Sequence, residues 1–127
     1  MEGLNVALEP FEYEWSLPRC LRRILRELNA GRAVCAVTSE GGLFEYGSDG
    51  EIVSNLIDIR GATAPDAIVV GSVTRDGEVV RASQGATRIS TRPRRLDAFR
   101  RLADETVWFL ERVVERPFSY NVRMAKA

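Results

Sequence analysis

The amino-acid sequence predicts an α+β fold in which one mostly antiparallel or mixed β-sheet is packed by two helices and ends in a C-terminal strand. Apolar residues recur at helical spacing in two stretches, about 17–29 and 93–116. Short apolar runs separated by glycine-containing turns lie between these stretches, and alternating apolar and polar residues follow Pro117. No linker rich in proline, glycine or serine interrupts the 127 residues, so we expect a single domain spanning 1–127.

Two short alternating segments precede the first helix. Residues 4–8 and 11–15 place apolar side chains at every second position, which is the period of a β-strand, and Pro10 separates them. Pro18 then suits the first turn of a helix, because its missing N–H would have no helical partner there. We therefore expect two strands followed by a helix that ends just before Gly31.

The middle of the chain has the composition of a β-rich region. Its apolar runs are short and are bounded by Gly-Gly, Asp-Gly or Ser-Asp-Gly sequences that favour turns. The last two runs flank Asp76-Gly77, a dipeptide typical of tight hairpins. We expect strands over 33–38, 43–47, 51–57, 67–73 and 78–83.

The second helix is expected to be long. Pro93 fits its first turn, and a broad apolar stripe that includes Leu96 and Phe99 runs along one face. Pro117 cannot continue a helix, so the helix should end before it. The alternation that begins at Phe118 predicts a half-buried terminal strand.

Several kinds of chemistry are excluded by residue types that the sequence lacks. It has no histidine, which removes serine–histidine and cysteine–histidine catalysis and histidine metal ligands. Its only lysine is Lys126, so no lysine is expected to act as a nucleophile or base inside the fold. Neither G-x-x-x-x-G-K-[ST] nor G-x-G-x-x-G occurs, so the sequence predicts no phosphate-binding loop of those types and no cofactor.

Cysteine content and hydropathy predict a cytoplasmic protein. Cys20 and Cys35 are too few for a disulfide scaffold or a thiolate metal cage. No apolar run approaches the roughly 20 residues that a membrane-spanning helix needs, so we expect no contact with a membrane. The segment 1–14 is acidic and lacks the basic start of a signal peptide.

Arginines gather around the expected start of the second helix. Between 88 and 101 the chain has six arginines and a single acid, Asp97, although the net charge of the whole chain is zero. Guanidinium groups suit phosphate, and the free N–H groups of a helix start attract anions. The cluster predicts a site for an anionic partner, either nucleic acid or an acidic protein, with pairing to acids of the same chain as the alternative. The predicted anion-binding residues are Arg88, Arg92, Arg94, Arg95, Arg100 and Arg101.

Trp108 is expected at an interface. On a helix over 93–116 its side chain falls opposite the apolar stripe, among charged residues such as Asp104. A large aromatic side chain on a charged face is typical of a contact with another chain. We therefore predict a homo-oligomer or a subunit of a complex. The alternative is that Phe11 or Tyr13 of the N-terminal segment covers this tryptophan.

The order of helix, strands, helix and strand, with Pro65-Asp66 ahead of the apolar strand 67–73, resembles the core of the restriction-endonuclease-like superfamily. That resemblance implies a nucleic-acid-processing protein in which Asp66 and Glu78 are the carboxylates that hold a metal ion. The acid-x-Lys pair of the superfamily is missing from 79–84, so the resemblance extends to a degenerate member without a working metal site.

The same element order is also similar to GAF, roadblock and profilin-type domains. The similarity lies in a hairpin in the middle of the chain and in the closing segment LDAFRRLADETVWFLERV. It implies a ligand sensor or a dimeric scaffold. The terminal strand after Pro117 departs from that pattern.

The function favoured by the sequence is a non-enzymatic binding or assembly domain that engages an anionic partner through the arginine cluster. We favour this hypothesis over a nuclease-like function centred on Asp66, because the chain lacks the lysine of the acid-x-Lys pair found in restriction-endonuclease-like proteins. A sensor or scaffold of the GAF or roadblock type is the further alternative. No metal site is predicted under the favoured hypothesis.

Overall fold

The computed structural model describes residue 3 and residues 5–76 and 91–127. These residues contain a four-stranded sheet with the strand order β1-β2-β4-β3. Strands β1 and β2 run parallel, whereas β4 pairs antiparallel with both β2 and β3. The predicted α+β class, with a mixed sheet and a C-terminal strand, is confirmed. The strands are β1 (Ala36–Ser39), β2 (Ile68–Thr74), β3 (Trp108–Glu115) and β4 (Ser119–Lys126).

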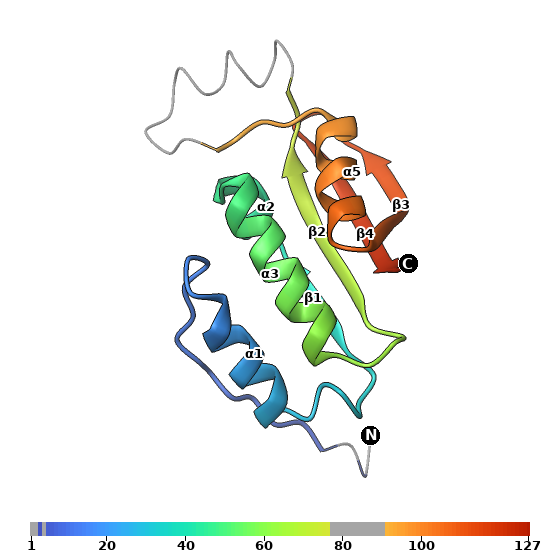
Figure 1. Ribbon diagram of the computed structural model, residues 1–127. Helices are drawn as coiled ribbons and strands as arrows, with labels where there is room; N and C mark the ends of the chain where they lie inside the picture. Colours follow the sequence, from blue (N-terminus) through green and yellow to red (C-terminus); the bar gives the residue numbers. More distant parts are fainter. Residues whose placement is uncertain (1–2, 4, 77–90) are drawn as a thin grey trace.

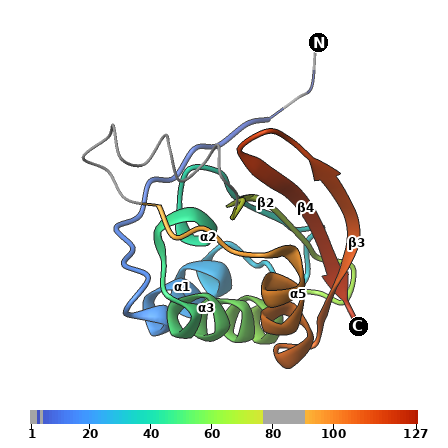
Figure 2. The same cartoon turned by 90° about the horizontal axis from the view of Figure 1, so that it is seen from above.

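Helices cover one face of this sheet. Helices α1, α3 and α5 lie side by side along that face, as Figures 1 and 2 show. Helices α2 and α3 connect β1 to β2, so the parallel pair forms a β-α-β unit. None of the helices in the described part of the chain is long and apolar enough to cross a membrane. The helices are α1 (Pro18–Glu27), α2 (Leu43–Tyr46), α3 (Asp49–Ala62) and α5 (Leu96–Glu105).

Local sequence explains where the first long helices begin and end. Helix α1 has Pro18 in its first turn, and Asn29 adopts a left-handed φ of 56° just after it, which confirms the predicted helix over 17–29. Helix α3 begins with a capping box. The Ser48 hydroxyl accepts a hydrogen bond from the Glu51 backbone N–H at 3.1 Å, and the Glu51 carboxylate accepts one from the Ser48 N–H at 2.9 Å.

Several strands predicted for the first half of the chain were wrong. Residues 51–57 lie inside α3, residues 43–47 overlap α2, and no strand forms in 5–16. The reason in α3 is that its buried residues recur every three to four positions, which is a helical period. The buried apolar residues of α3 are Ile52, Leu56, Ile59 and Ala62.

The other expected strands have different outcomes. Strand β1 overlaps the predicted strand over 33–38, β2 confirms the strand over 67–73, and β4 is the predicted terminal strand. The strand predicted over 78–83 lies outside the described residues.

The predicted helix over 93–116 is divided into a helix and a strand. Helix α5 ends at Glu105, Val107 has a left-handed φ of 61°, and β3 begins at Trp108. The sequence TVWF consists of β-branched and aromatic residues, which favour a strand over a helix. Trp108 is therefore 0% exposed, and its indole N–H donates to the carbonyl oxygen of Leu56 at 3.1 Å. The prediction of an exposed interface at Trp108 was wrong, because it depended on a continuous helix.

A glycine in β2 lets α2 lie close to the sheet. A Cβ atom at Gly71 would stand 2.6 Å from Cδ2 of Phe44 and 2.7 Å from the carbonyl oxygen of Ser39. The Phe44 ring packs edge-on against Phe99 with 5.1 Å between ring centroids, so it has little room to move. Gly71 thus brings the carboxyl end of β1 and the start of α2 together.

The two edges of the sheet differ in charge. Strand β3 has an irregular register within it and charged side chains along it. The charged residues of β3 are Glu111, Arg112 and Glu115. At the opposite edge, residues 33–39 around β1 are uncharged. The N–H of Ile68 donates to the carbonyl of Cys35 at 3.1 Å, so the N–H and C=O groups of the next residue, Ala36, point toward the edge at which no described strand pairs with β1.

Candidate ligand-binding site

A pocket of about 280 Å³ opens at the carboxyl end of β1, beneath the helices that cover the sheet. In α/β sheets, ligands bind outside the carboxyl ends of the parallel strands. Residues of the N-terminal segment, β1, α2 and α3 line this pocket. Its volume lies just below the roughly 300–1,000 Å³ of pockets that enclose whole drug-sized ligands, so it suits one ring system.

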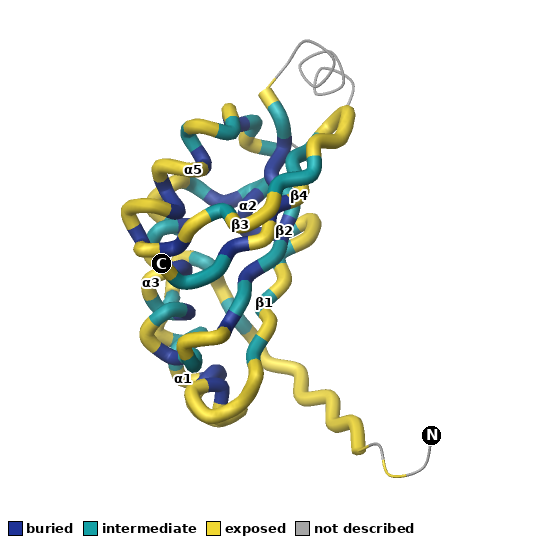
Figure 3. Tube along the Cα trace, turned by 90° about the vertical axis from the view of Figure 1, so that its right-hand side faces the viewer, coloured by how far each residue is buried: buried dark blue, intermediate teal, exposed yellow. Residues whose placement is uncertain are grey.

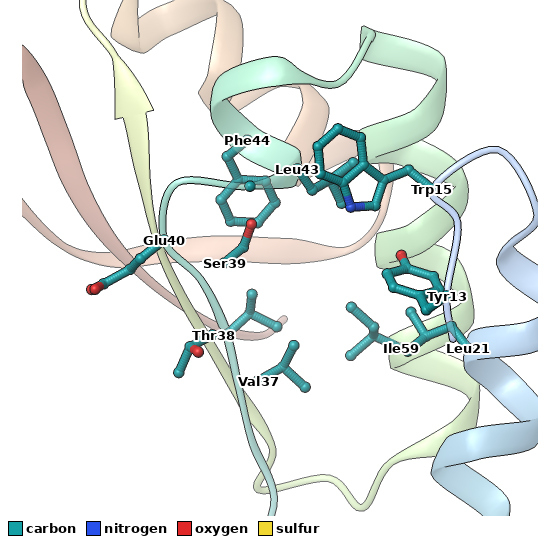
Figure 4. A pocket seen from close by; sticks show the side chains of 12 residues that line it. Tyr13, Trp15, Leu21, Val37, Thr38, Ser39, Glu40, Leu43, Phe44 and Ile59 are labelled. Atoms are coloured by element: carbon teal, nitrogen blue, oxygen red, sulfur yellow. The ribbon is translucent and has the colours of Figure 1, made fainter. Parts of the chain in front are cut away.

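Aromatic and aliphatic side chains form most of the pocket wall. Tyr13 and Trp15 project from the segment before α1 and stand across the opening from Val37 of β1 (Figure 4). Leu43 and Phe44 of α2 close the end nearest the turn after β1. Apolar walls with two flanking aromatic rings favour a flat, uncharged group.

Ser39 is an unpaired polar group in this apolar wall. Its Oγ atom is buried and has no hydrogen-bond partner among the described residues. A Cβ atom at Gly42 would stand 3.5 Å from this Oγ and 3.8 Å from the Trp15 ring, so glycine leaves the hydroxyl uncovered. An unsatisfied buried hydroxyl costs about 1–3 kcal/mol. A ligand atom that accepts from or donates to this hydroxyl would offset that cost.

Asn55 of α3 connects the N-terminal segment to the helices. Its amide nitrogen donates to the carbonyl oxygens of Trp15 at 2.9 Å and Glu51 at 2.7 Å. The Tyr13 hydroxyl donates to its amide oxygen. Burial, followed by the negative charges of Asp58 and Glu51, raises the pKa of Tyr13 to about 12. The phenol therefore stays protonated at neutral pH and remains a hydrogen-bond donor.

Glu40 stands at the mouth of the pocket. Among the described residues that line the pocket, Glu40 is the one with a charged side chain. Its carboxylate is exposed and points away from Tyr13 and Trp15 (Figure 4). The interior of the pocket is therefore uncharged, whereas its rim carries one negative charge.

The structure places Arg94 of the predicted anion site inside the protein. Its side chain is 7% exposed, and its Nε atom lies 2.9 Å from a carboxylate oxygen of Asp49. Its two terminal nitrogens donate to the carbonyl oxygens of Phe44 at 3.0 Å and Gly47 at 2.7 Å. Arg94 thus holds α2 and the start of α3 in place and is not available to an external anion.

The other described arginines of that cluster are exposed, and most of them lie near carbonyl or carboxylate oxygens. Arg92 donates to a backbone carbonyl at the end of α2 at 3.2 Å. Arg95 and Arg101 lie 3.3 Å and 3.9 Å from the carboxylate of Asp97. Arg95 and Arg100 border a shallow hollow that also contains acidic side chains. Positive and negative charges are therefore mixed at the start of α5.

The structure describes one of the two predicted metal-binding carboxylates. Asp66 is exposed in the turn before β2. Glu78, like Arg88 of the predicted anion site, lies outside the described part of the chain. Within that part, no group of three or more histidine, cysteine, aspartate or glutamate side chains is arranged to hold a metal ion.

The pocket was missed by reasoning from the sequence, since its residues come from distant parts of the chain. One local signal was available. Gly41-Gly42 follows an apolar strand and precedes the helical pair Leu43 and Phe44, which is the position of a ligand-binding turn in α/β proteins. Nothing in the sequence indicated that Tyr13 and Trp15 line a pocket, because the alternation of apolar and polar residues around them is typical of a β-strand.

Comparisons with known proteins identify the fold. No protein-family model and no curated protein matches this chain. The pyocyanin biosynthetic protein PhzM aligns with a TM-score of 0.59 and 19% sequence identity, covering 90% of this chain and 41% of PhzM. The methyltransferase CalO6 aligns with a TM-score of 0.59 and 19% identity, covering 77% of this chain and 37% of CalO6.

A third structure was solved with ligands. The O-methyltransferase NcsB1 of neocarzinostatin biosynthesis, in complex with S-adenosyl-L-homocysteine and 1,4-dihydroxy-2-naphthoic acid, aligns with a TM-score of 0.56 and 14% identity. The alignment covers 72% of this chain and 29% of NcsB1. At these identities the similarity shows a shared fold. The chain spans about two fifths or less of the length of the three structures.

The shared fold corrects the function that the sequence favoured. The chain has a fold found in methyltransferases, so the interpretation as a non-enzymatic binder of nucleic acid or another anionic partner was wrong. The nuclease-like alternative was also wrong, and the sensor or scaffold alternative has no support from these structures. The burial of Arg94 and the mixed charges around Asp97 are the physical reasons why the arginine pattern misled.

Proposed function

We propose that this chain is part of an S-adenosylmethionine-dependent methyltransferase and that its pocket receives the adenine ring of the methyl donor. The fold shared with CalO6 and NcsB1 supports this proposal, as does the complex of NcsB1 with S-adenosyl-L-homocysteine. The observation that carries it is the unpartnered hydroxyl of Ser39, set in an aromatic pocket at the carboxyl end of a parallel strand.

The residues present fit an adenosyl group. Trp15 and Tyr13 offer ring faces for stacking, and the Ser39 hydroxyl can donate to an adenine ring nitrogen or accept from the adenine amino group. Glu40 lies at the mouth, and its carboxylate would have to turn toward the pocket to accept hydrogen bonds from ribose hydroxyls. The pocket has room for the ring and not for the whole donor.

The chain's own contribution would be to bind and orient the donor. When bound, S-adenosylmethionine would supply an electrophilic methyl group for transfer to a nucleophilic atom of the acceptor. The apolar wall would exclude water from the adenine ring and hold the ring in the pocket. The free thiols of Cys20 and Cys35 are consistent with a cytoplasmic site of action.

Calorimetric titration of the full chain with S-adenosyl-L-homocysteine and with adenosine tests this function. Both ligands are expected to bind and to compete, because they share the adenine ring. Trp15→Ala should weaken both by about 5- to 150-fold, since stacking a base on an aromatic side chain is worth about 1–3 kcal/mol. Phe118→Ala is the matched control, because Phe118 is 52% exposed and lies outside the pocket. A wild-type chain that binds neither ligand would refute the proposal.

Ser39→Ala should change affinity and stability in opposite directions. Loss of one hydrogen bond to the ligand is expected to weaken S-adenosyl-L-homocysteine binding by roughly 2- to 10-fold. Without ligand, the variant should be as stable as the wild type or more stable, because an unsatisfied buried hydroxyl has been removed. Calorimetric titration and urea unfolding measure the two effects, with the exposed Ser54→Ala as control. Unchanged affinity together with lower stability would mean that the hydroxyl serves the fold alone.

A further inference from the structure

A buried side chain of α3 anchors the described part of the N-terminal segment. Val6 and Leu8 are 82% and 92% exposed, and Figure 3 shows this part of the segment extending away from the body of the protein. Farther along the segment, Tyr13 and Trp15 reach the body of the protein and line the pocket. Part of the pocket wall therefore belongs to a segment whose residues Val6 and Leu8 are exposed.

The anchor is the amide of Asn55. This side chain is 0% exposed, although asparagine is a polar residue in the middle of α3. Its nitrogen donates to the Trp15 carbonyl at 2.9 Å and its oxygen accepts from the Tyr13 hydroxyl. One buried amide thus satisfies a backbone group and a side-chain group of the same segment, two residues apart.

We infer that Asn55 is a positioning residue that holds the aromatic wall of the pocket against the end of β1, an inference that rests on the proposed function for its ligand. Loss of the amide would leave the Tyr13 hydroxyl and the Trp15 carbonyl without these partners in a partly buried place. Both groups recover hydrogen bonds in water if the segment moves away from α3. The helices and the sheet keep their own contacts, so the predicted response is undocking of the segment and not unfolding.

Undocking would lower ligand affinity in proportion to the docked fraction. The apparent dissociation constant equals the intrinsic one divided by the fraction of molecules that are competent to bind. If Asn55→Leu reduces the docked fraction to about a tenth, the affinity for S-adenosyl-L-homocysteine falls about tenfold. Bound ligand in turn favours the docked state, so ligand binding and segment docking are linked.

Acrylamide quenching of tryptophan fluorescence measures docking without any ligand. Trp15 is half-buried when docked, whereas Trp108 is fully buried and gives a nearly constant background that the Trp15→Phe variant measures separately. Asn55→Leu is expected to raise the quenching constant of Trp15 at least about twofold and to weaken S-adenosyl-L-homocysteine about tenfold by calorimetry. Tyr13→Phe, which removes one of the two hydrogen bonds, should give a smaller change in the same direction.

Thr106→Val is the matched control. Thr106 is 2% exposed and its hydroxyl donates to the carbonyl oxygens of Leu102 and Ala103, so the variant also removes a buried hydrogen-bonding group, but at the end of α5 and outside the pocket. Its Trp15 quenching and ligand affinity should equal those of the wild type. If Asn55→Leu and Thr106→Val change the Trp15 quenching constant and the ligand affinity equally, a general loss of stability explains both variants and the positioning role is refuted.

The outcomes separate the two proposals. If the wild type does not bind S-adenosyl-L-homocysteine but Asn55→Leu exposes Trp15, the proposed function fails and the positioning role stands. If Trp15 quenching is unchanged in a folded Asn55→Leu chain, the positioning role is refuted whether or not the ligand binds. Should Asn55→Leu not fold, Tyr13→Phe decides, and wild-type quenching in that variant also refutes the inference.

Discussion

Replacing Trp108 with alanine is expected to lower the free energy of unfolding by about 3–5 kcal/mol. The indole is 0% exposed and packs between the sheet and α3, where its N–H donates to the Leu56 carbonyl at 3.1 Å. Alanine would leave a cavity that the strand backbone cannot close, because Val107 and the pairing of β3 with β4 fix the position of residue 108. Urea unfolding followed by far-ultraviolet circular dichroism measures the change.

A large exposed aromatic residue provides the comparison. Phe118→Ala, at a position that is 52% exposed, should change the unfolding free energy by much less than Trp108→Ala. Light scattering on Trp108→Ala gives an independent check of the buried assignment. If the variant keeps wild-type stability and instead changes the oligomeric mass, the indole belongs to an interface, as the helical interpretation of 93–116 predicted.

Arg94→Met is expected to destabilise the protein by roughly 2–5 kcal/mol. The substitution keeps an unbranched side chain but removes the donors to the Phe44 and Gly47 carbonyls, each of which costs about 1–3 kcal/mol when left unsatisfied in the interior. The ion pair with Asp49 adds little, because the Asp49 side chain is 70% exposed to solvent. Thermal and urea unfolding should therefore show nearly the same loss at low and high salt.

The neighbouring arginine is the control for that experiment. Arg95 is 76% exposed and its partner Asp97 is 59% exposed, so Arg95→Met should change stability by no more than about 0.5 kcal/mol. Asp49→Asn should likewise have a small effect, because the two carbonyl contacts of Arg94 remain. Equal losses for Arg94→Met and Arg95→Met would show that net charge, and not the carbonyl contacts, governs the result.

The parts of the fold that the sequence predicted are those with strong local signals. Pro18 and the leucines after it marked α1, and the apolar run before Thr74 marked β2. The alternation after Pro117 marked β4. In each case the periodicity of the apolar residues and a proline or glycine at the boundary predicted the same element. No local preference for a different structure opposed that prediction.

The errors arose where two local signals disagreed. The segment after Ser48 contains β-branched residues, which favour a strand, but Ser48 and Glu51 also form a capping box, and this second signal was decisive for α3. In the second half, the apolar stripe of α5 continues in helical register into β3. The change of structure occurs at Val107, whose left-handed backbone could not be inferred from a β-branched residue, since such residues rarely adopt it.

The candidate site had almost no local signal. Tyr13, Ser39 and Asn55 are separated along the chain and meet only because β1, α3 and the N-terminal segment converge. No periodicity encodes such a contact. The arginine pattern was prominent in the sequence, but charge clustering does not distinguish a surface patch from a side chain such as Arg94 that has internal carbonyl partners.

Because the two edges of the sheet differ, an additional β-strand would pair with one edge in preference to the other. At β3, charged side chains and an irregular register discourage the addition of another strand. At β1, the N–H and C=O groups of Ala36 and Thr38 point outward along an uncharged edge, and the side chain of Val34 just before the strand is 88% exposed. A further strand, from whatever polypeptide it comes, would therefore extend the sheet at β1, and a lysine placed at position 36 would selectively block that extension while leaving the β3 side unchanged.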